Sequence, residues 1–538
     1  MTAFGIDLGT THSCVSMIDE AGRPVIVKNA VGEETTPSVV YFESASNVLV
    51  GSVAKNSALL EPDRVAQLVK RDMGKPVSYW YNGQQHSPEA VSALILRELV
   101  RATRQQVGEV MSDVVITVPA YFGVAEREAT RRAGQIAGLN VLDVLAEPVA
   151  AAIAYRVERG VTELKHVLVY DLGGGTFDVS VIRLDGDDIA VVCTDGIDNL
   201  GGADWDKAIA DYLLSQFAAE HPGSDPASDP RFMQDLLIAA EQLKKHLSAV
   251  QKRRHILRFA GAVTRVELDR AQVEEMTAPL LERTVAVTER AIAAARRAGV
   301  TEFDNVILVG GMSKLPAVTR ILKDRLGLEA QLYDPDLAVA KGAALFALMR
   351  TIGDNGKVSP KAAEDAASQT GMTVPEVVAL ASKRVTTVLP RAFGVKGVDG
   401  RDPIAAIDPV NARQMVVHLL RANTPLPADT GPYTFHTAVD NQRMVGIEVW
   451  EQASEFESDD PAENRKVGEA LLRDLPARLP ARSPFEVTFL MSELGVLSVH
   501  AIEPKSGADV RFDLNIGGLG AADVAKAKAA VARYDVSG

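Results

Sequence analysis

The feature that most constrains the fold is a short strand–turn–strand unit that occurs twice. An apolar run at residues 4–6 ends at Asp7-Leu8-Gly9-Thr10-Thr11, and a second apolar run follows the turn. The run at residues 167–170 ends at Asp171-Leu172-Gly173-Gly174-Gly175-Thr176, 164 residues further along, and is also followed by an apolar run. Short apolar runs bounded by Gly, Asp or Pro are typical of buried strands. The repetition predicts two related halves.

The two turns are suited to binding a polyphosphate. Glycine tolerates positive φ and has no side chain to block a ligand, and concave groups of backbone N–H attract phosphate oxygens. Asp7 and Asp171 would lie beside the phosphates, where carboxylates suit Mg²⁺, which binds oxygen and usually keeps several waters. Two ordinary glycine-containing hairpins are the alternative. The P-loop pattern G-x-x-x-x-G-K-[ST] is absent from the sequence.

The first 352 residues alternate short strands with longer helical patterns, which predicts an α/β domain with mostly covered sheets. Further strands are expected at residues 114–118 and 306–309. The helical patterns cover residues 88–107, 124–138, 229–250 and 272–298. Gly310-Gly311 follows the last of these strands and would admit a flat ligand such as a base or a ribose, although in isolation a plain turn is the better explanation.

The composition changes after residue 352. Residues 353–385 are rich in Ala, Ser, Lys and Asp, and we expect a linker with some helix. Residues 386–517 contain runs of period two, such as Val445, Ile447 and Val449, which predict an antiparallel β-sandwich domain. Residues 518–538 are expected to form one short amphipathic helix over 521–534.

Charge and cysteine content exclude several classes of protein. Lys and Arg number 57 against 71 Asp and Glu, a net charge of −14, which argues against a nucleic-acid binder. Cys14 and Cys193 are too few for a disulfide framework or a zinc site. The N-terminus lacks the pattern of a signal peptide, and no apolar stretch reaches the roughly 20 residues of a membrane span. We therefore expect a cytoplasmic protein that binds neither nucleic acid nor membrane.

Seven ordered motifs in the first part of the chain resemble the ATPase domain of the seventy-kilodalton heat-shock proteins, the DnaK-type chaperones of the actin-like ATPase superfamily. They are residues 5–14 (GIDLGTTHSC), 118–122 (VPAYF), 147–148 (EP), 171–178 (DLGGGTFD), 200–204 (LGGAD), 309–311 (VGG) and 334–343 (DPDLAVAKGA). The β-rich part is similar to that family's peptide-binding domain at residues 423–427, 437–442, 486–489 and 518–520. The resemblance implies a duplicated, ribonuclease H-like fold for residues 1–352.

The resemblance also implies catalytic roles and cofactors, namely ATP or ADP and Mg²⁺. Lys70 matches a phosphate-contacting lysine, and Glu147 matches the carboxylate that positions the attacking water. Asp171 and Thr176 would act beside the γ-phosphate, and Asp7, Asp171 and Asp178 would order Mg²⁺, mostly through water. Without the resemblance, Lys70 reads as a surface lysine and Glu147 as the start of a helix.

Further residues would hold the nucleotide. Phosphate contacts are expected from Gly9, Thr10, Thr11, His12, Gly173, Gly174, Gly175 and Gly202. Adenosine contacts are expected from Glu241, Lys244, Lys245, Ser248, Gly310, Gly311, Lys314 and Asp336. Spacings of three, four and seven put Glu241, Lys244 or Lys245, and Ser248 on one helical face, which would also suit an exposed charge pair. Lys314 stands where relatives often have Arg, so it would keep the charge but lose planar stacking on the base.

The resemblance further implies a peptide groove in the β-sandwich, formed by Phe435, Ala438, Val445 and Ile447, with Val398 placed less securely. The alternative is that these residues belong to the core of the sandwich. Expected partners are unfolded or extended polypeptide segments, a J-domain co-chaperone and a nucleotide exchange factor. Relatives continue into a helical lid, and we expect this chain to lack one and to release peptides quickly.

The sequence departs from the family at the interdomain linker, where residues 385–388 (VTTV) replace a run of leucines. Thr-Thr buries less apolar area, so coupling between the domains is expected to be weaker or differently made. The leading hypothesis is an ATP-hydrolysing, lidless chaperone whose nucleotide state modulates peptide binding. The alternatives are an actin-like ATPase scaffold that binds one dedicated partner, and a kinase for a small molecule on the same fold.

Overall fold

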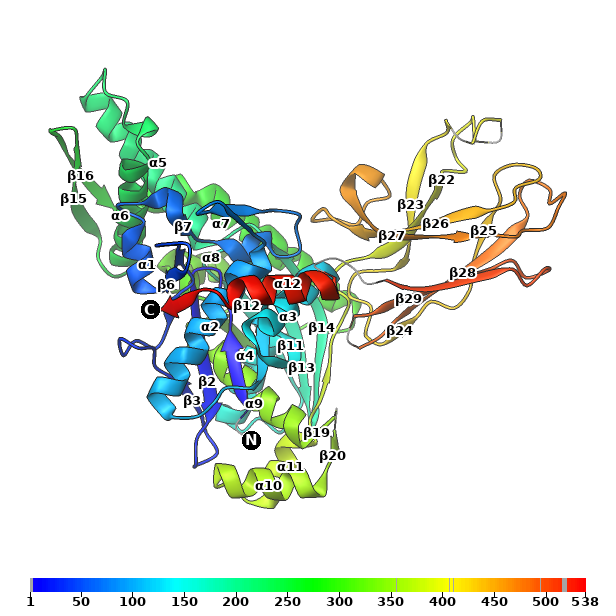
Figure 1. Ribbon diagram of the computed structural model, residues 1–538, viewed down its shortest axis with the longest axis horizontal. Helices are drawn as coiled ribbons and strands as arrows, with labels where there is room; N and C mark the ends of the chain where they lie inside the picture. Colours follow the sequence, from blue (N-terminus) through cyan, green and yellow to red (C-terminus); the bar gives the residue numbers. More distant parts are fainter. Residues whose placement is uncertain (1–2, 355, 406, 410, 494, 515–519) are drawn as a thin grey trace.

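The computed structural model describes residues 3–354, 356–405, 407–409, 411–493, 495–514 and 520–538. The expected domain boundary at 517/518, and most of the 518–520 motif, lie outside these residues. Figure 1 shows a large α/β part that contains both ends of the described chain and a separate β-rich part to one side. None of the described helices is long and apolar enough to cross a membrane.

Two sheets of the same design form the α/β part. The strands of the first are β1 (Phe4–Asp7), β2 (His12–Ile18), β3 (Pro24–Val27), β10 (Asp113–Val118) and β11 (Asn140–Ala146). Those of the second are β12 (Lys165–Leu172), β13 (Phe177–Asp185), β14 (Asp188–Ile197), β17 (Asn305–Val309) and β18 (Ala330–Leu332). Their orders, β11-β10-β1-β2-β3 and β18-β17-β12-β13-β14, correspond strand by strand.

The predicted repetition is confirmed by the strand pairing. β1 and β2 form an antiparallel hairpin around the first glycine turn, and β12 and β13 form one around the second. In both sheets the first hairpin strand also pairs in parallel with a strand from later in the chain, β10 in one case and β17 in the other. The two glycine turns therefore occupy equivalent positions in the two sheets.

Two helices pack between the sheets and hold the halves together. α4 (Glu147–Arg159) and α9 (Ala338–Ile352) share one apolar core with residues of both sheets. Close approach of the helices depends on Gly342, because a Cβ there would lie 1.8 Å from the carbonyl oxygen of Ala150. The other helices of this part are α2 (Pro88–Val107), α3 (Val124–Ala137), α5 (Gly202–Glu220), α6 (Pro230–Ala249), α7 (Arg270–Arg297) and α8 (Pro316–Leu326). The four predicted helical patterns thus correspond to α2, α3, α6 and α7.

The segment after α9 folds against the α/β part. It contains α10 (Pro360–Thr370) and α11 (Val374–Ala381), which bury Ala363 and Val377 in the core between the sheets. The next strand, β21 (Arg384–Thr386), pairs in parallel with β14 and extends the second sheet. The start of the threonine-containing linker is thus held against the second sheet as a strand. Backbone hydrogen bonds to β14 there replace part of the apolar contact that a run of leucines would make.

Residues 386–514, here called the β region, form two antiparallel sheets. One contains β22 (Phe393–Val398), β23 (Gln414–Leu420), β26 (Val445–Gln452) and β27 (Asn464–Leu472). The other contains β24 (Ala428–Asp429), β25 (Tyr433–His436), β28 (Pro484–Met491), β29 (Leu497–Ile502) and β30 (Asp509–Leu514). The inward side chains of both sheets, such as Val449 and Phe489, form one apolar core, as the period-two patterns require.

The last described segment returns to the α/β part. α12 (Ala521–Val531) ends three residues earlier than predicted, and β31 (Asp535–Ser537), which was not predicted, pairs in parallel with β6 (Asn47–Val50). Val531, Tyr534 and Val536 are buried in the core of the first half. The sequence gives no local signal for this strand because its partner lies almost 490 residues away.

Candidate functional site

A cavity of about 550 Å³ lies between the two halves of the α/β part. Both glycine turns contribute to its wall, through Gly9, Thr10, Thr11 and His12 from the first and Gly173, Gly174 and Thr176 from the second. The volume is within the range of cavities that bind small molecules and cofactors. Its wall brings together residues that are far apart in the sequence, from Asp7 to Val339.

The two glycine turns touch each other across this cavity. A Cβ added to Gly174 would lie 2.2 Å from the Thr11 hydroxyl oxygen, and one added to Gly175 would lie 2.3 Å from the Thr10 methyl carbon. Gly201 approaches the second turn just as closely, since a Cβ there would lie 2.4 Å from the Gly175 nitrogen. A side chain at any of these glycines would overlap its neighbours and widen the contact. Because glycine has no side chain, the backbones of both halves can lie close enough to contact one ligand.

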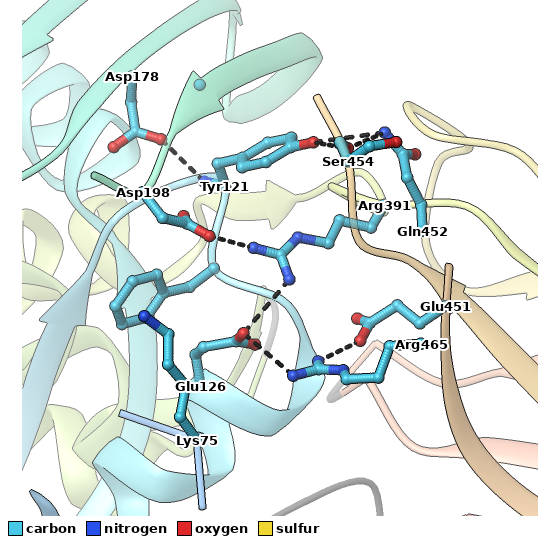
Figure 2. Close-up of polar contacts among 12 residues, drawn as sticks. Lys75, Tyr121, Glu126, Asp178, Asp198, Arg391, Glu451, Gln452, Ser454 and Arg465 are labelled. Atoms are coloured by element: carbon cyan, nitrogen blue, oxygen red, sulfur yellow. Dashed lines mark hydrogen bonds and ion pairs between the residues drawn. The ribbon is translucent and has the colours of Figure 1, made fainter. Parts of the chain in front are cut away.

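Three carboxyl groups lie at the base of the turns, with Asp171 and Asp178 buried and Asp7 partly exposed to the cavity. Burial, followed by repulsion from Glu147, raises the pKa of Asp7 to about 7, although Lys70 and a hydrogen bond from Thr117 act in the opposite direction. Burial and Glu147 also raise the pKa of Asp171 and of Asp178 well above the usual range. The backbone N–H of Tyr121 donates to Asp178 at 2.9 Å (Figure 2). The site thus holds more negative charge than its own cations balance, which favours a bound cation.

Lys70 and Glu147 form a buried ion pair in the cavity wall, with Nζ and Oε1 2.5 Å apart. Lys70 lies in a 3₁₀ turn, Val69–Asp72, which follows Leu68 at a φ of 60°. A left-handed leucine is costly and occurs where the surrounding structure demands it. Glu147 is the first residue of α4, as its sequence context suggested. The structure therefore buries both groups instead of leaving Lys70 on the surface.

The opposite wall comes from α6 and the first half. Glu241 bridges Lys55 at 2.5 Å and Lys245 at 2.7 Å, and these two lysines outweigh the effect of burial and lower the Glu241 pKa to about 2. Lys244 donates to the carbonyl oxygen of Gly202 at 3.0 Å. The predicted helical face of α6 thus lines the cavity. Its residue Glu241 forms an ion pair with Lys55 of the first half.

The remaining wall residues surround the far end of the cavity. Lys314 bonds to Asp336, and both line the cavity together with Gly310 and Gly311. Gly310 has a φ of 80°, and a Cβ there would lie 2.4 Å from the Leu172 carbonyl oxygen. Burial, with Lys55 and Lys245 nearby, lowers the pKa of His12 to about 4, so this side chain is neutral near pH 7.

The structure brings nearly all the predicted cleft residues into one wall. Gly175 and Asp178 lie just behind it, Gly175 against the Thr10 side chain and Asp178 against the Tyr121 backbone. Within the described part of the chain, no group of three or more His, Cys, Asp or Glu side chains is arranged to ligate a metal directly. That Asp7, Asp171 and Asp178 order a metal ion through water stays a prediction.

The sequence interpretation missed two charged contacts of this site. Lys55 was missed because it lies in a six-residue helix, α1 (Ser52–Ser57), with no local motif. Arg71 was missed although it follows Lys70 directly. Its guanidinium binds the Asp204 carboxylate at 2.6 Å and the Gly175 carbonyl oxygen at 3.1 Å, which ties the 3₁₀ turn to the second half.

The predicted groove residues of the β region are dispersed. Ile447 is fully buried and Val445 nearly so in the shared core of the two sheets, and in this conformation a peptide cannot reach Ile447. Phe435 is half-buried, with its ring stacked on Phe485, and Ala438 is exposed. Val445 and Ile447 therefore belong to the core of the two sheets, because both side chains lie on the inward face of β26.

Comparison with known protein families gives one match in the α/β part. The family model described as "Hsp70 protein" matches residues 3–80 and 75–355, which is more than half of the chain and includes both glycine turns, Lys70, Glu147 and the whole cavity wall.

Proposed function

The chain belongs to the Hsp70 family, and from this membership and the cleft we propose that it binds ATP between its two halves and hydrolyses it to ADP and phosphate. The observation that carries the proposal is the contact of the two glycine turns beside the buried Lys70–Glu147 pair. Backbone N–H groups of such glycine turns suit phosphate oxygens, and the cavity of about 550 Å³, lined by these turns and by Lys314, leaves room for a nucleoside.

In the proposed reaction, water attacks the γ-phosphorus and the bond to the β-phosphate oxygen breaks. Lys70 stabilises the negative charge that spreads over the γ-phosphoryl oxygens in the transition state. Glu147 accepts a hydrogen bond from the attacking water and orients it. Thr10, Thr11 and Thr176 line the cavity beside the turns and donate to phosphate oxygens.

The acidic residues fit a divalent cation. Burial is the largest cause of the raised pKa values of Asp7 and Asp171, and repulsion from Glu147 adds to it. A nearby cation would favour the charged forms, and Asp178 Oδ2 has no hydrogen-bond partner among the described residues. Mg²⁺ bound with the phosphates would neutralise charge on the leaving group. Because no direct ligand set is present in the described part of the chain, these carboxylates would hold the ion through its waters.

We further propose that the β region, as a β-sandwich, binds extended polypeptide in a nucleotide-dependent manner, with a J-domain co-chaperone and an exchange factor as partners. The loop between β25 and β26 exposes Val439 and Met444, and β25 exposes Tyr433, so apolar side chains for a peptide are present on the surface. The burial of Val445 and Ile447 favours the second candidate, a scaffold with one dedicated partner. A panel of unrelated apolar peptides, measured with ATP and with ADP, separates the two.

Replacement of Glu147 by Gln tests the hydrolytic step. The amide keeps the size of the side chain but orients the water less well, so phosphate release should fall about tenfold or more while ATP still binds. An unchanged rate of phosphate release would show that Glu147 only begins α4, and would remove it from the mechanism.

A further inference from the structure

A cluster of five charged residues, three of them buried and two partly exposed, joins the α/β part to the β region. We call it the docking cluster: Glu126 of α3, Asp198 after β14, Arg391 before β22, Glu451 of β26 and Arg465 of β27 (Figure 2). The side chain of Glu451 is fully buried, and those of Arg391 and Glu126 are 6% and 7% exposed. None of these residues lines the cavity between the halves, so the cluster is separate from the proposed nucleotide site.

Each carboxylate of the docking cluster is paired through only one of its oxygens. Arg391 binds Asp198 Oδ2 at 2.5 Å and Glu126 Oε1 at 3.3 Å. Arg465 binds Glu451 Oε2 at 2.5 Å and lies 3.7 Å from the same Glu126 Oε1. Glu126 is therefore the α/β residue on which both arginines of the β side converge (Figure 2).

The remaining oxygens lie close together without a donor. Among the described residues, none donates a hydrogen bond to Glu126 Oε2 or Glu451 Oε1. Both oxygens lie within 3 Å of the point that a Cβ on Gly123 would occupy. Gly123 is thus needed to leave room for them. Two carboxylate oxygens from opposite sides of the contact face the same small space, and Nη1 of Arg391, 3.3 Å from that point, borders it without a hydrogen bond to either oxygen.

The surrounding charges do not balance the cluster. It contains three carboxylates and two guanidinium groups. The ring of Tyr121 lies 4.9 Å from the Arg391 guanidinium, and Arg127 donates to backbone carbonyls. Lys75 also acts on Asp198 and lowers its pKa, but this lysine is exposed and 3.7 Å from Asp72. One carboxylate of the cluster is therefore left without a guanidinium of its own, in a contact where the Glu126 and Glu451 side chains are buried, which is costly.

We propose that Glu126 and Glu451 share one proton across this contact, so that docking of the β region takes up a proton. A carboxylic acid O–H donates to the facing carboxylate, satisfies both orphan oxygens and brings the buried charge to balance. When the β region separates, both carboxyl groups meet water and release the proton. Like-charged carboxyl groups at one buried site commonly share a proton in this way.

The direction of the pH dependence follows from linkage. Burial, with Glu126 adding to it, raises the pKa of Glu451 against the opposing effects of Arg391 and Arg465. A group that binds its proton more tightly in the docked state favours docking at low pH, and this contribution is lost as the pH rises through the raised value. Within that window the docking constant should fall by up to about tenfold per pH unit.

Hydrogen exchange of the full chain between pH 5 and pH 9 tests the proposal. The Thr194 amide donates to the Asn423 side chain of the β region at 2.7 Å, so it reports on docking. After correction for intrinsic exchange rates, its protection should fall with pH in the wild type. In Glu451→Gln the slope should decrease by one proton, because the amide donates to Glu126 without titrating. Glu469→Gln, an exposed residue of the adjacent strand, is the matched control and should keep the wild-type slope.

A pH-independent protection in the wild type would overturn the proposal, and so would equal slopes in the wild type and Glu451→Gln. Far-UV circular dichroism and a melting curve establish that the variant is folded. If Glu451→Gln does not fold, Glu126→Gln removes the same proton from the other side of the contact and should decrease the slope equally. None of these measurements requires nucleotide, so their failure would leave the proposed ATPase activity untouched.

Discussion

The cavity between the halves and the docking cluster are two buried groups of acidic side chains that are balanced in different ways. In the cavity, Asp7, Asp171 and Glu147 have Lys70 as their close cation, and the wall opens onto about 550 Å³ of space. In the docking cluster, Arg391 and Arg465 occupy the space themselves. The cavity therefore leaves its charge for a ligand to balance, whereas the docking cluster balances most of its charge from within.

This difference indicates which buried charges serve binding and which serve assembly. Lysine is a compact point charge that leaves room for a phosphate, and arginine bridges two carboxylates with its planar donors. Tyr121 lies between the two groups, with its N–H on Asp178 and its hydroxyl donating to the Ser454 carbonyl oxygen at 3.2 Å (Figure 2). Substitutions in one group should therefore leave the other largely unchanged, except at Tyr121.

The largest effect is expected from Arg391→Ala. Removal of this guanidinium leaves Glu126, Asp198 and Glu451 with one arginine, and breaking a buried pair in this manner costs about 3–5 kcal/mol. Protection of the Thr194 amide should be lost, while ATP affinity changes little. Retention of wild-type protection would show that the docking cluster does not hold the β region. Arg254→Ala, at an exposed ion pair, is the control.

Lys70→Ala should have the next largest effect, this time on the cavity alone. Loss of one group that stabilises transition-state charge typically lowers the rate by about 10²–10³-fold. Phosphate release should fall by that factor, with ATP affinity and Thr194 protection nearly unchanged. Lys207→Ala removes an exposed lysine of α5 and should hydrolyse ATP at the wild-type rate. Wild-type turnover in Lys70→Ala would exclude Lys70 from the reaction.

Gly174→Ala should weaken nucleotide binding by a smaller amount. The new Cβ would overlap the Thr11 hydroxyl, and overpacking of this kind costs about 1–3 kcal/mol. Titration calorimetry should show ATP affinity reduced by about tenfold or more. Gly397→Ala has open space around its Cβ and serves as the control. Equal affinity for the two variants would mean that contact between the turns is unimportant for binding.

Tyr121→Phe should have the smallest effect. It removes two hydrogen bonds to the β region, one donated to the Ser454 carbonyl oxygen and one accepted from the Gln452 amide, and keeps the backbone bond to Asp178. The Gln452 amide keeps its own bond to Ser454, so the net loss should be close to that of one typical hydrogen bond, about 0.5–1.5 kcal/mol. Thr194 protection should fall about two- to tenfold, and the rate of hydrolysis should stay at the wild-type value. A large loss of hydrolysis would instead show that the two groups depend on each other through the Tyr121 ring.

The sequence predicted the cavity better than the docking contact for a physical reason. A glycine turn after an apolar strand is a local signal, so Gly9 and Gly174 could be recognised along with their strands. Lys55 and Arg391 have no such signal, because their partners Glu241 and Glu126 are 186 and 265 residues away. β31 was missed for the same reason. The sequence also could not show whether Ile447 lies in a groove or in the core. Period-two alternation tells that alternate side chains share a face, but not whether that face lines a groove or the core.

Calorimetric titration of the full chain with ATP and Mg²⁺ tests the central claim most directly. The account predicts that one nucleotide binds per chain, between the two glycine turns and beside the Lys70–Glu147 pair. Gly174→Ala should bind ATP more weakly than the wild type, and Gly397→Ala should bind it equally well. Absence of binding at millimolar ATP, or binding that Gly174→Ala leaves unaltered, would contradict the account of this cavity as the nucleotide site.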